Sequence, residues 1–187
     1  MPPPFEVRRA THVDVEPALD LFTAVAEEGR WIGTEPGFDR AARAEQRHAR
    51  IDDPDGAAAF VAVTAVDSGD DDVAGEAGGG DRVIGDLGIT LAPYGVADLG
   101  MVVAADWRGR GVGSALLAAA VDWARGAGAH KVALQLWPHN VAARGLYDKH
   151  GFVEEGYLRR HYRRADGSLW DAVVMGLVLD ETTPRAP

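Results

Sequence analysis

The most informative segment of this chain is Asp106-Trp107-Arg108-Gly109-Arg110-Gly111-Val112-Gly113-Ser114-Ala115-Leu116-Leu117. It follows an apolar run from Ala97 to Ala104, which predicts a strand, and leads into an apolar helix predicted over Ser114–Ala124. Glycines let a backbone approach a ligand closely, and the first amides of a helix have no partners within the helix. Together with the positive end of the helix dipole, they form a site for an anion such as a pyrophosphate. Arg108 and Arg110 add cationic side chains to this turn.

Two other phosphate-binding turns do not fit this stretch. A Walker loop ends in Gly-Lys-Ser/Thr, and no Gly-Lys pair occurs anywhere in the sequence. A dinucleotide-binding fold requires Gly-x-Gly-x-x-Gly and an acidic residue at the end of the next strand, about 20 residues on. Here the glycines stand at 109, 111 and 113, and the next strand, predicted over Lys131–Trp137, runs into Trp-Pro-His-Asn.

The motif Arg108-x-x-Gly111-x-Gly113 resembles the Arg/Gln-x-x-Gly-x-Gly/Ala signature of the GNAT superfamily, the acyl-CoA-dependent N-acetyltransferases. A later segment, Asn140-x-x-Ala143-x-x-x-Tyr147-x-x-x-Gly151-Phe152, resembles the second block of that family. The two blocks stand in the family's order, with one helix and one strand between them. The resemblance implies acetyl-CoA as co-substrate, bound by Arg108, Gly109, Arg110, Gly111, Gly113, Ser114 and Asn140. Asn140 can also cap the helix that follows it, or do both.

The remaining pattern predicts an α/β fold in a single domain over residues 1–187. Apolar runs predict strands near residues 5–10, 57–66, 83–91, 97–104, 131–137, 152–163 and 169–179, and helical spacing predicts helices near residues 13–28, 38–50, 114–124 and 141–149. An Asp166-Gly167 turn between the last two runs predicts a hairpin. The resemblance implies a GNAT-like mixed, mostly antiparallel central sheet, flanked by helices and splayed at the acyl-CoA site.

Composition excludes several classes of protein. The chain has no cysteine, which excludes disulfides, a thiolate metal site and an acyl-cysteine intermediate, and we expect no metal. Much of the net charge of −10 comes from residues 67–81, an acidic, glycine-rich segment expected to be a mobile loop, and residues 181–187 are expected to be a disordered tail. The mildly acidic remainder argues against nucleic-acid binding. Without a signal-peptide pattern or a membrane-length apolar run, we expect a cytoplasmic protein that does not bind a membrane.

Acetyl transfer from a thioester to an amine needs a neutral amine, a stabilised carbonyl oxygen and a stabilised leaving thiolate. In the family, backbone groups of a splayed strand serve the carbonyl and the pantetheine, which implies a cofactor-binding role here for Met101 and Val103. Gly100 between them marks either a β-bulge or a glycine tolerated in a regular strand. Tyr147 matches the tyrosine of the second block and is the candidate general acid, with an ordinary core tyrosine as the alternative.

No motif identifies the general base, because family members use varied carboxylates or a water chain. Asp98 on the central strand and Glu35 in the loop expected to cover the substrate are equal candidates, with a solvent-exposed carboxylate as the alternative for either. His161 and Asp171 in the C-terminal hairpin are weaker candidates, and His139 is interpreted as a loop histidine.

The substrate pocket is predicted to include aromatic side chains and a carboxylate, from the segment Trp31-Ile32-Gly33-Thr34-Glu35 and from Tyr157, Tyr162 and Trp170 of the hairpin. This mixture suits a small primary amine, for example an amino acid or a polyamine. A protein or peptide amine is the second hypothesis, and a non-catalytic acyl-CoA-binding module is the third. The resemblance also allows a homodimer.

Overall fold

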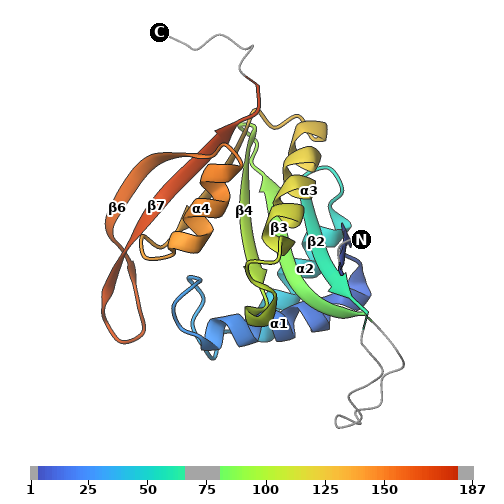
Figure 1. Cartoon of the computed structure of the whole chain (residues 1–187), viewed down its shortest axis with the longest axis horizontal. Helices are drawn as coiled ribbons and strands as arrows, with labels where there is room; N and C mark the ends of the chain where they lie inside the picture. The colour runs from blue at the N-terminus through green and yellow to red at the C-terminus, as the bar shows by residue number, and fades with distance from the viewer. Residues whose placement is uncertain (1–3, 66–80, 181–187) are drawn as a thin grey trace.

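The computed structural model describes residues 4–65 and 81–180, and its strands form one seven-stranded sheet in the order β1-β2-β3-β4-β5-β7-β6 (Figure 1). The strands are β1 (Glu6–Arg9), β2 (Ala57–Thr64), β3 (Arg82–Leu91), β4 (Val96–Val103), β5 (Lys131–Leu136), β6 (Val153–Arg163) and β7 (Leu169–Val178). Every neighbouring pair is antiparallel except β4 and β5. The prediction of a mixed, mostly antiparallel sheet is confirmed. The expected acidic loop, apart from Asp81, and the expected tail lie outside the described residues.

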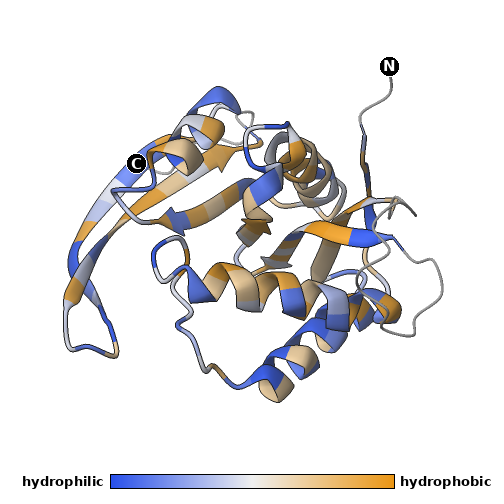
Figure 2. Cartoon of the chain, turned by 60° about the horizontal axis from the view of Figure 1, so that its bottom comes forward, coloured by the Kyte–Doolittle hydropathy of each residue, from blue (hydrophilic) through white to orange (hydrophobic). Residues whose placement is uncertain are grey.

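Within the described residues, four α-helices flank this sheet: α1 (Val15–Glu27), α2 (Arg40–Asp52), α3 (Val112–Gly126) and α4 (Val141–Lys149). In Figure 1, α3 and α4 lie on the near face, on either side of β4, and Figure 2 brings α1 and α2 forward from the other face. The second helix was predicted from residue 38 but begins at Arg40, because the Asp39 side chain accepts a hydrogen bond from the amide of Ala42 at 2.9 Å and caps it. Among the described helices, none has the length and apolar character needed to cross a bilayer.

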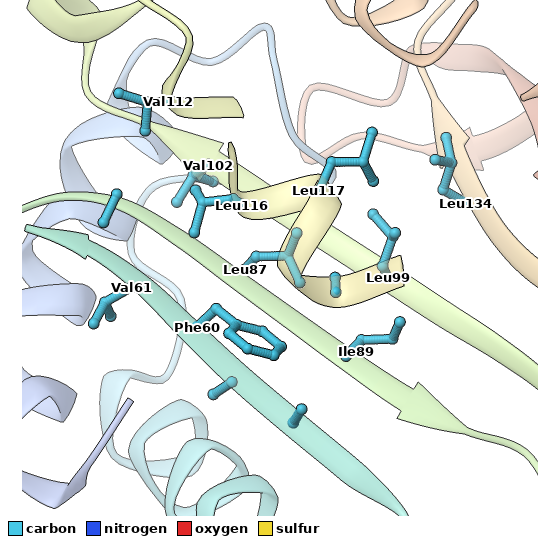
Figure 3. Packing of buried hydrophobic residues seen from close by; sticks show 14 of the residues in the cluster. Phe60, Val61, Leu87, Ile89, Leu99, Val102, Val112, Leu116, Leu117 and Leu134 are labelled. Carbon is cyan, nitrogen blue, oxygen red and sulfur yellow. The ribbon is translucent and has the colours of Figure 1, made fainter. Parts of the chain in front are cut away.

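The apolar face of α3 packs on the centre of the sheet. Leu116 and Leu117 are fully buried, against Leu87 and Ile89 of β3 and Leu99 of β4 (Figure 3). Burying a leucine side chain of this kind contributes about 1.5–3 kcal/mol. This contact fixes the start of α3 over the middle strands, which places the glycine turn at the edge where β4 ends.

The sheet splays between its two parallel strands. β4 pairs with β5 from Val96 to Asp98, whereas Leu99–Val103 has no strand partner on that side among the described residues. The remainder of β5 pairs only with β7. Gly100 does not mark a bulge: it pairs in regular register with Gly88 of β3, so the backbone groups freed in this run come from the splay and not from an irregular strand.

Candidate active site

The glycine turn presents free amides at the start of α3. This helix was predicted from Ser114 but begins at Val112, with Gly111 as its N-cap in the left-handed region at φ +90°. Gly109 is also left-handed, at φ +74°, a conformation that favours glycine. The amides of Val112, Gly113 and Ser114 donate to no acceptor within the described chain. The turn therefore offers an anion the backbone donors and helix dipole that the sequence predicted.

The guanidinium groups of the two arginines of the turn both contact other side chains of the protein. The Arg108 guanidinium forms a two-hydrogen-bond ion pair with Glu28, after the last turn of α1, and its Nε donates to the carbonyl of Val103 at 3.1 Å. This pairing, led by the hydrogen bonds from Arg108, lowers the pKa of Glu28. Arg110 lies over the ring of Trp107, 5.3 Å from its centroid. Arg108 thus ties the turn to α1, in addition to lining the cavity beside it.

One cavity of about 970 Å³ joins the turn to the splay and continues to the opposite face of the sheet. The half beside the turn, where the acetyl donor is expected, is called the donor half and is lined by Met101, Val103, Arg108, Gly109, Gly111, Gly113, Ser114, Asn140, Ala143 and Tyr147. The other half, where the amine is expected, is called the acceptor half and is lined by Trp31, Thr34, Arg43, Arg47, Arg50, Asp86, Gly88, Gln135, Trp137 and Tyr162. Of the predicted cofactor residues, only Arg110 is absent from this lining. The structure therefore brings the two halves of the predicted site together around the run Leu99–Val103.

Tyr147 lies in the donor half on α4. Its side chain is 6% exposed, its ring packs on Phe152 with centroids 5.5 Å apart, and its hydroxyl bonds to no described residue. Burial raises the pKa of Tyr147 to about 12. The phenol therefore stays protonated at physiological pH and is available as a hydrogen-bond donor to a ligand in the cavity.

Asn140 caps α4. Its side-chain oxygen accepts a hydrogen bond from the amide of Ala143 at 3.2 Å, which realises the capping alternative, and the residue also lines the cavity. Neighbouring His139 acts as a tether, because its Nε2 donates to the carbonyl of Arg30 at 2.7 Å. Both residues fix the segment between β5 and α4 against the loop that follows α1.

The predicted aromatic wall is only partly as expected. Trp31 and Tyr162 line the cavity, and the Tyr162 hydroxyl donates to Gln135 at 2.6 Å. Trp170 does not line the cavity. Its ring packs edge-on against the ring of Trp137, with centroids 5.2 Å apart. Trp137, which was predicted only as the end of a strand, also belongs to this wall. It is buried and lines the cavity, and its Nε1 has no acceptor within the described chain.

Neither candidate base presents its carboxylate to the cavity. The Glu35 carboxylate accepts a hydrogen bond from the amide of Ala165 at 2.9 Å and forms an ion pair with Arg164 at 3.2 Å. Arg164 also donates a hydrogen bond to the carbonyl of Gly33 at 2.7 Å. These contacts form a clasp between the loop after α1 and the β6–β7 turn. Asp98 is exposed on the same face of β4 as Gly100, two residues away.

The weaker base candidates of the hairpin are also outside the cavity. Asp171 accepts hydrogen bonds from the Tyr157 hydroxyl at 2.8 Å and the amide of Arg160 at 2.6 Å, and these two lower its pKa. His161 packs edge-on against Tyr162, with ring centroids 4.8 Å apart. Among the described residues, no group of three His, Cys, Asp or Glu side chains could hold a metal ion.

A cluster of three arginines from α2 also lies in the acceptor half and was not predicted. Arg47 forms a buried ion pair with Asp86 of β3, and Arg43 and Arg50 flank it. The signal in the sequence was their spacing of four and three residues, which puts all three on one face of a helix that is otherwise polar. Figure 2 shows this hydrophilic helix on the face opposite α3.

A sequence model of the acetyltransferase (GNAT) family matches residues 20–152. A curated relative, the uncharacterized N-acetyltransferase YobR of Bacillus subtilis (strain 168), is 38% identical over 63 residues. That match covers 34% of this chain and 25% of YobR, so the chain aligns with only a quarter of that relative's length.

Solved structures share the whole fold. A GNAT superfamily phosphinothricin acetyltransferase from Sinorhizobium meliloti, in complex with acetyl-CoA, has a TM-score of 0.77 at 17% identity, over 98% of this chain and 93% of that one. A ribosomal-protein-alanine N-acetyltransferase from Brucella melitensis has a TM-score of 0.75 at 24% identity, over 93% of this chain and 99% of that one. Their two names specify very different acceptors, so the fold does not determine the acceptor.

Proposed function

Since the chain belongs to the GNAT family of acetyltransferases, we propose that it transfers an acetyl group from acetyl-CoA to a primary amine of a small molecule, by direct attack in a ternary complex. The observation that carries the proposal is a continuous cavity, which connects the free amides of α3 with an acceptor pocket through the splay between β4 and β5. Both substrates therefore fit at once, and a chain without cysteine offers no thiol to carry the acyl group between them.

The donor half supplies the contacts for acetyl-CoA. The pyrophosphate accepts hydrogen bonds from the amides of Val112, Gly113 and Ser114. The pantetheine extends along Leu99–Val103, whose free edge takes the place of a missing strand, with Met101 and Val103 as contact residues. A backbone amide of the same run donates to the thioester carbonyl as it gains negative charge.

The reaction then needs one proton for the leaving sulfur. The amine nitrogen attacks the carbonyl carbon, the C–S bond breaks, and the thiolate takes the proton of the Tyr147 hydroxyl. The phenolate regains a proton from the nitrogen, which must lose one as the amide forms. Burial keeps the phenol protonated until this step. It makes the phenol a weaker acid and the departing thiolate a stronger base, so its two effects on the proton transfer oppose each other.

For removal of the first amine proton, Asp98 is better placed than Glu35. Asp98 is two residues from Gly100 on the same face of β4, about 7 Å along the strand, and is exposed to water that can relay the proton. Glu35 is held in the clasp with Arg164 and Ala165, where it positions the loop that carries Trp31.

The test is incubation of the purified protein with acetyl-CoA and a panel of small amines, with release of free CoA thiol as the readout and mass spectrometry of the product. A peptide with a free N-terminus tests the protein-amine alternative in the same assay. We expect release that depends on a small amine. Tight acetyl-CoA binding without release for any amine or peptide would contradict the proposal and indicate a non-catalytic acyl-CoA-binding module.

A further inference from the structure

The arginine cluster of α2, defined as Arg43, Arg47 and Arg50, carries more positive charge than its surroundings neutralise. Among the described residues, Asp86 is the one carboxylate that interacts with all three guanidinium groups. This local excess of positive charge contrasts with the net charge of the whole chain, which is −10. Burial lowers the pKa of Arg43 and Arg50, which indicates that neither cation is fully compensated.

Arg47 is the clearest sign of a missing anion. It is 5% exposed, and although one terminal nitrogen pairs with Asp86, its Nε and Nη2 are buried without an acceptor in the described chain. Buried donors on a charged group are costly when unpaired, and native structures pair nearly all of them. Arg47 lines the cavity, so an anion there lies beside the guanidinium whose donors the protein leaves unpaired.

The floor of the sheet is hollow beside this cluster. Gly88 and Gly100 pair across β3 and β4, so neither strand has a side chain at this point of the face toward α2. The Arg50 guanidinium occupies the space over Gly88, where an added Cβ would lie 2.7 Å from its Nη1. Over Gly100 an added Cβ would meet nothing within 4 Å, so the space next to Arg50 is open.

Resting on the proposed function, we infer that the acceptor is a compact amine with an anionic group, a carboxylate or a similar oxyanion, held by Arg47 and Arg50 over Gly88. The amine then lies over Gly100, at the strand that holds the acetyl group. Neighbouring strands are about 5 Å apart, and a charge-assisted hydrogen bond of about 2.8 Å from the Arg50 guanidinium covers part of this distance, so the short span between the amine and the carboxylate of an amino acid covers the rest. Bidentate pairing with guanidinium favours such an oxyanion over a neutral or cationic amine, including a polyamine.

The cluster is not a second part of the phosphate site. Residues alternate between the two faces along β3. Asp86 and Gly88 face α2, whereas Gly85 and Leu87 face α3. An added Cβ at Gly85 would lie 2.8 Å from side chains of both Val112 and Leu116 of α3. The arginines therefore lie on the face of the sheet opposite the helix whose N-terminus takes the pyrophosphate.

The test compares acceptors of nearly the same size that differ in the charge of one group, assayed at a pH at which both amines are largely neutral. The proteinogenic L-amino acids and their carboxamides are assayed pairwise for CoA release, with spermidine as a cationic arm and aminoalkylphosphonates as a second oxyanion arm. The variant is Arg50→Gln, which leaves the Arg47–Asp86 pair intact, and Arg43→Gln is the second variant if the first does not fold. Arg125→Gln removes the same charge from the exposed surface of α3, where Arg125 pairs with Asp122, and serves as the matched control.

We expect the acids to exceed their amides in kcat/KM, and Arg50→Gln to lower kcat/KM for the acid by about tenfold to a hundredfold while the amide is nearly unchanged. Arg125→Gln should leave both unchanged. Amides or spermidine used as well as the acids, with no selective effect of Arg50→Gln, would overturn the inference and leave the proposed function standing.

If no acceptor is acetylated, the proposed function fails and the anion site is judged by thermal denaturation in the presence of CoA. A stabilisation by the amino acid that its amide lacks, and that Arg50→Gln abolishes, supports the site. Equal effects of acid and amide overturn it.

Discussion

Tyr147→Phe tests the proposed chemistry with the smallest possible change, because it removes one oxygen from a buried side chain. The hydroxyl bonds to no described residue, and the ring contact with Phe152 is retained, so we expect little change in the free energy of unfolding. A positioned general acid contributes about 10²- to 10⁴-fold to a rate. Tyr147→Phe should therefore lower kcat by at least about a hundredfold while the Kd of acetyl-CoA, measured by calorimetry, stays the same.

The pKa of Tyr147 adds a pH signature to this prediction. Burial raises it from 10.0 to about 12, so at pH 9 only about one molecule in a thousand has lost the phenolic proton. The phenol is the active form below its pKa, and activity due to it should be lost only as pH rises toward 12. The wild-type kcat should therefore show no descending limb up to pH 10. A limb with its midpoint near 10, or a Tyr147→Phe variant with normal kcat, would exclude Tyr147 as the general acid.

Three further substitutions test the turn, the core and an ion pair. Gly111→Val places a β-branched residue at φ +90° in the phosphate turn and should weaken acetyl-CoA binding by calorimetry; an unchanged Kd would contradict the assignment of the turn. Leu116→Ala leaves a cavity at a fully buried position and should cost about 2–5 kcal/mol by urea denaturation, and a cost below about 1 kcal/mol would argue against the packing of α3. Asp14 bonds to Arg8 and Thr11, and although burial opposes the shift, these hydrogen bonds lower its pKa from 3.8 to about 2. The ionised Asp14 carboxylate stabilises the fold fully above the pKa that it has in the unfolded chain, and this stabilisation is lost as pH falls from 4 toward 2. Asp14→Asn should therefore lower the free energy of unfolding by about 1–2 kcal/mol at pH 7 and by little at pH 2. The same loss at both pH values would argue against the ion pair of Asp14 with Arg8.

The donor half of the cavity could be predicted from the sequence because its residues are close together in the chain. The turn, the splayed strand and α4 all fall between Leu99 and Lys149, so local motifs and spacing describe them nearly completely. What the motif could not give was the partner of Arg108. Its ion pair with Glu28 joins positions 80 residues apart, and only the folded packing of α1 against the turn creates it.

The acceptor half could not be predicted in the same way. Trp137 appeared in the sequence as the end of a strand, and its role depends on the hairpin residues Tyr162 and Trp170 that pack against it. The helical spacing of Arg47 with Arg43 and Arg50 was visible in the sequence. The sequence did not indicate that Arg47 would pair with Asp86 through one nitrogen and keep two nitrogens without an acceptor in the described chain. Glu35 was placed in the right loop, yet its carboxylate is engaged by Arg164, about 130 positions away.

We expect the clasp between Glu35 and Arg164 to make the two binding sites form in a fixed order during synthesis. The donor half is complete once the chain has been made through α4, because all of its lining residues precede position 150. The acceptor half must wait for the last hairpin, whose Arg164 closes a loop of about 130 residues onto Gly33. Contacts this distant in sequence form late, so we expect the nascent protein to acquire its cofactor site before it can distinguish one amine from another.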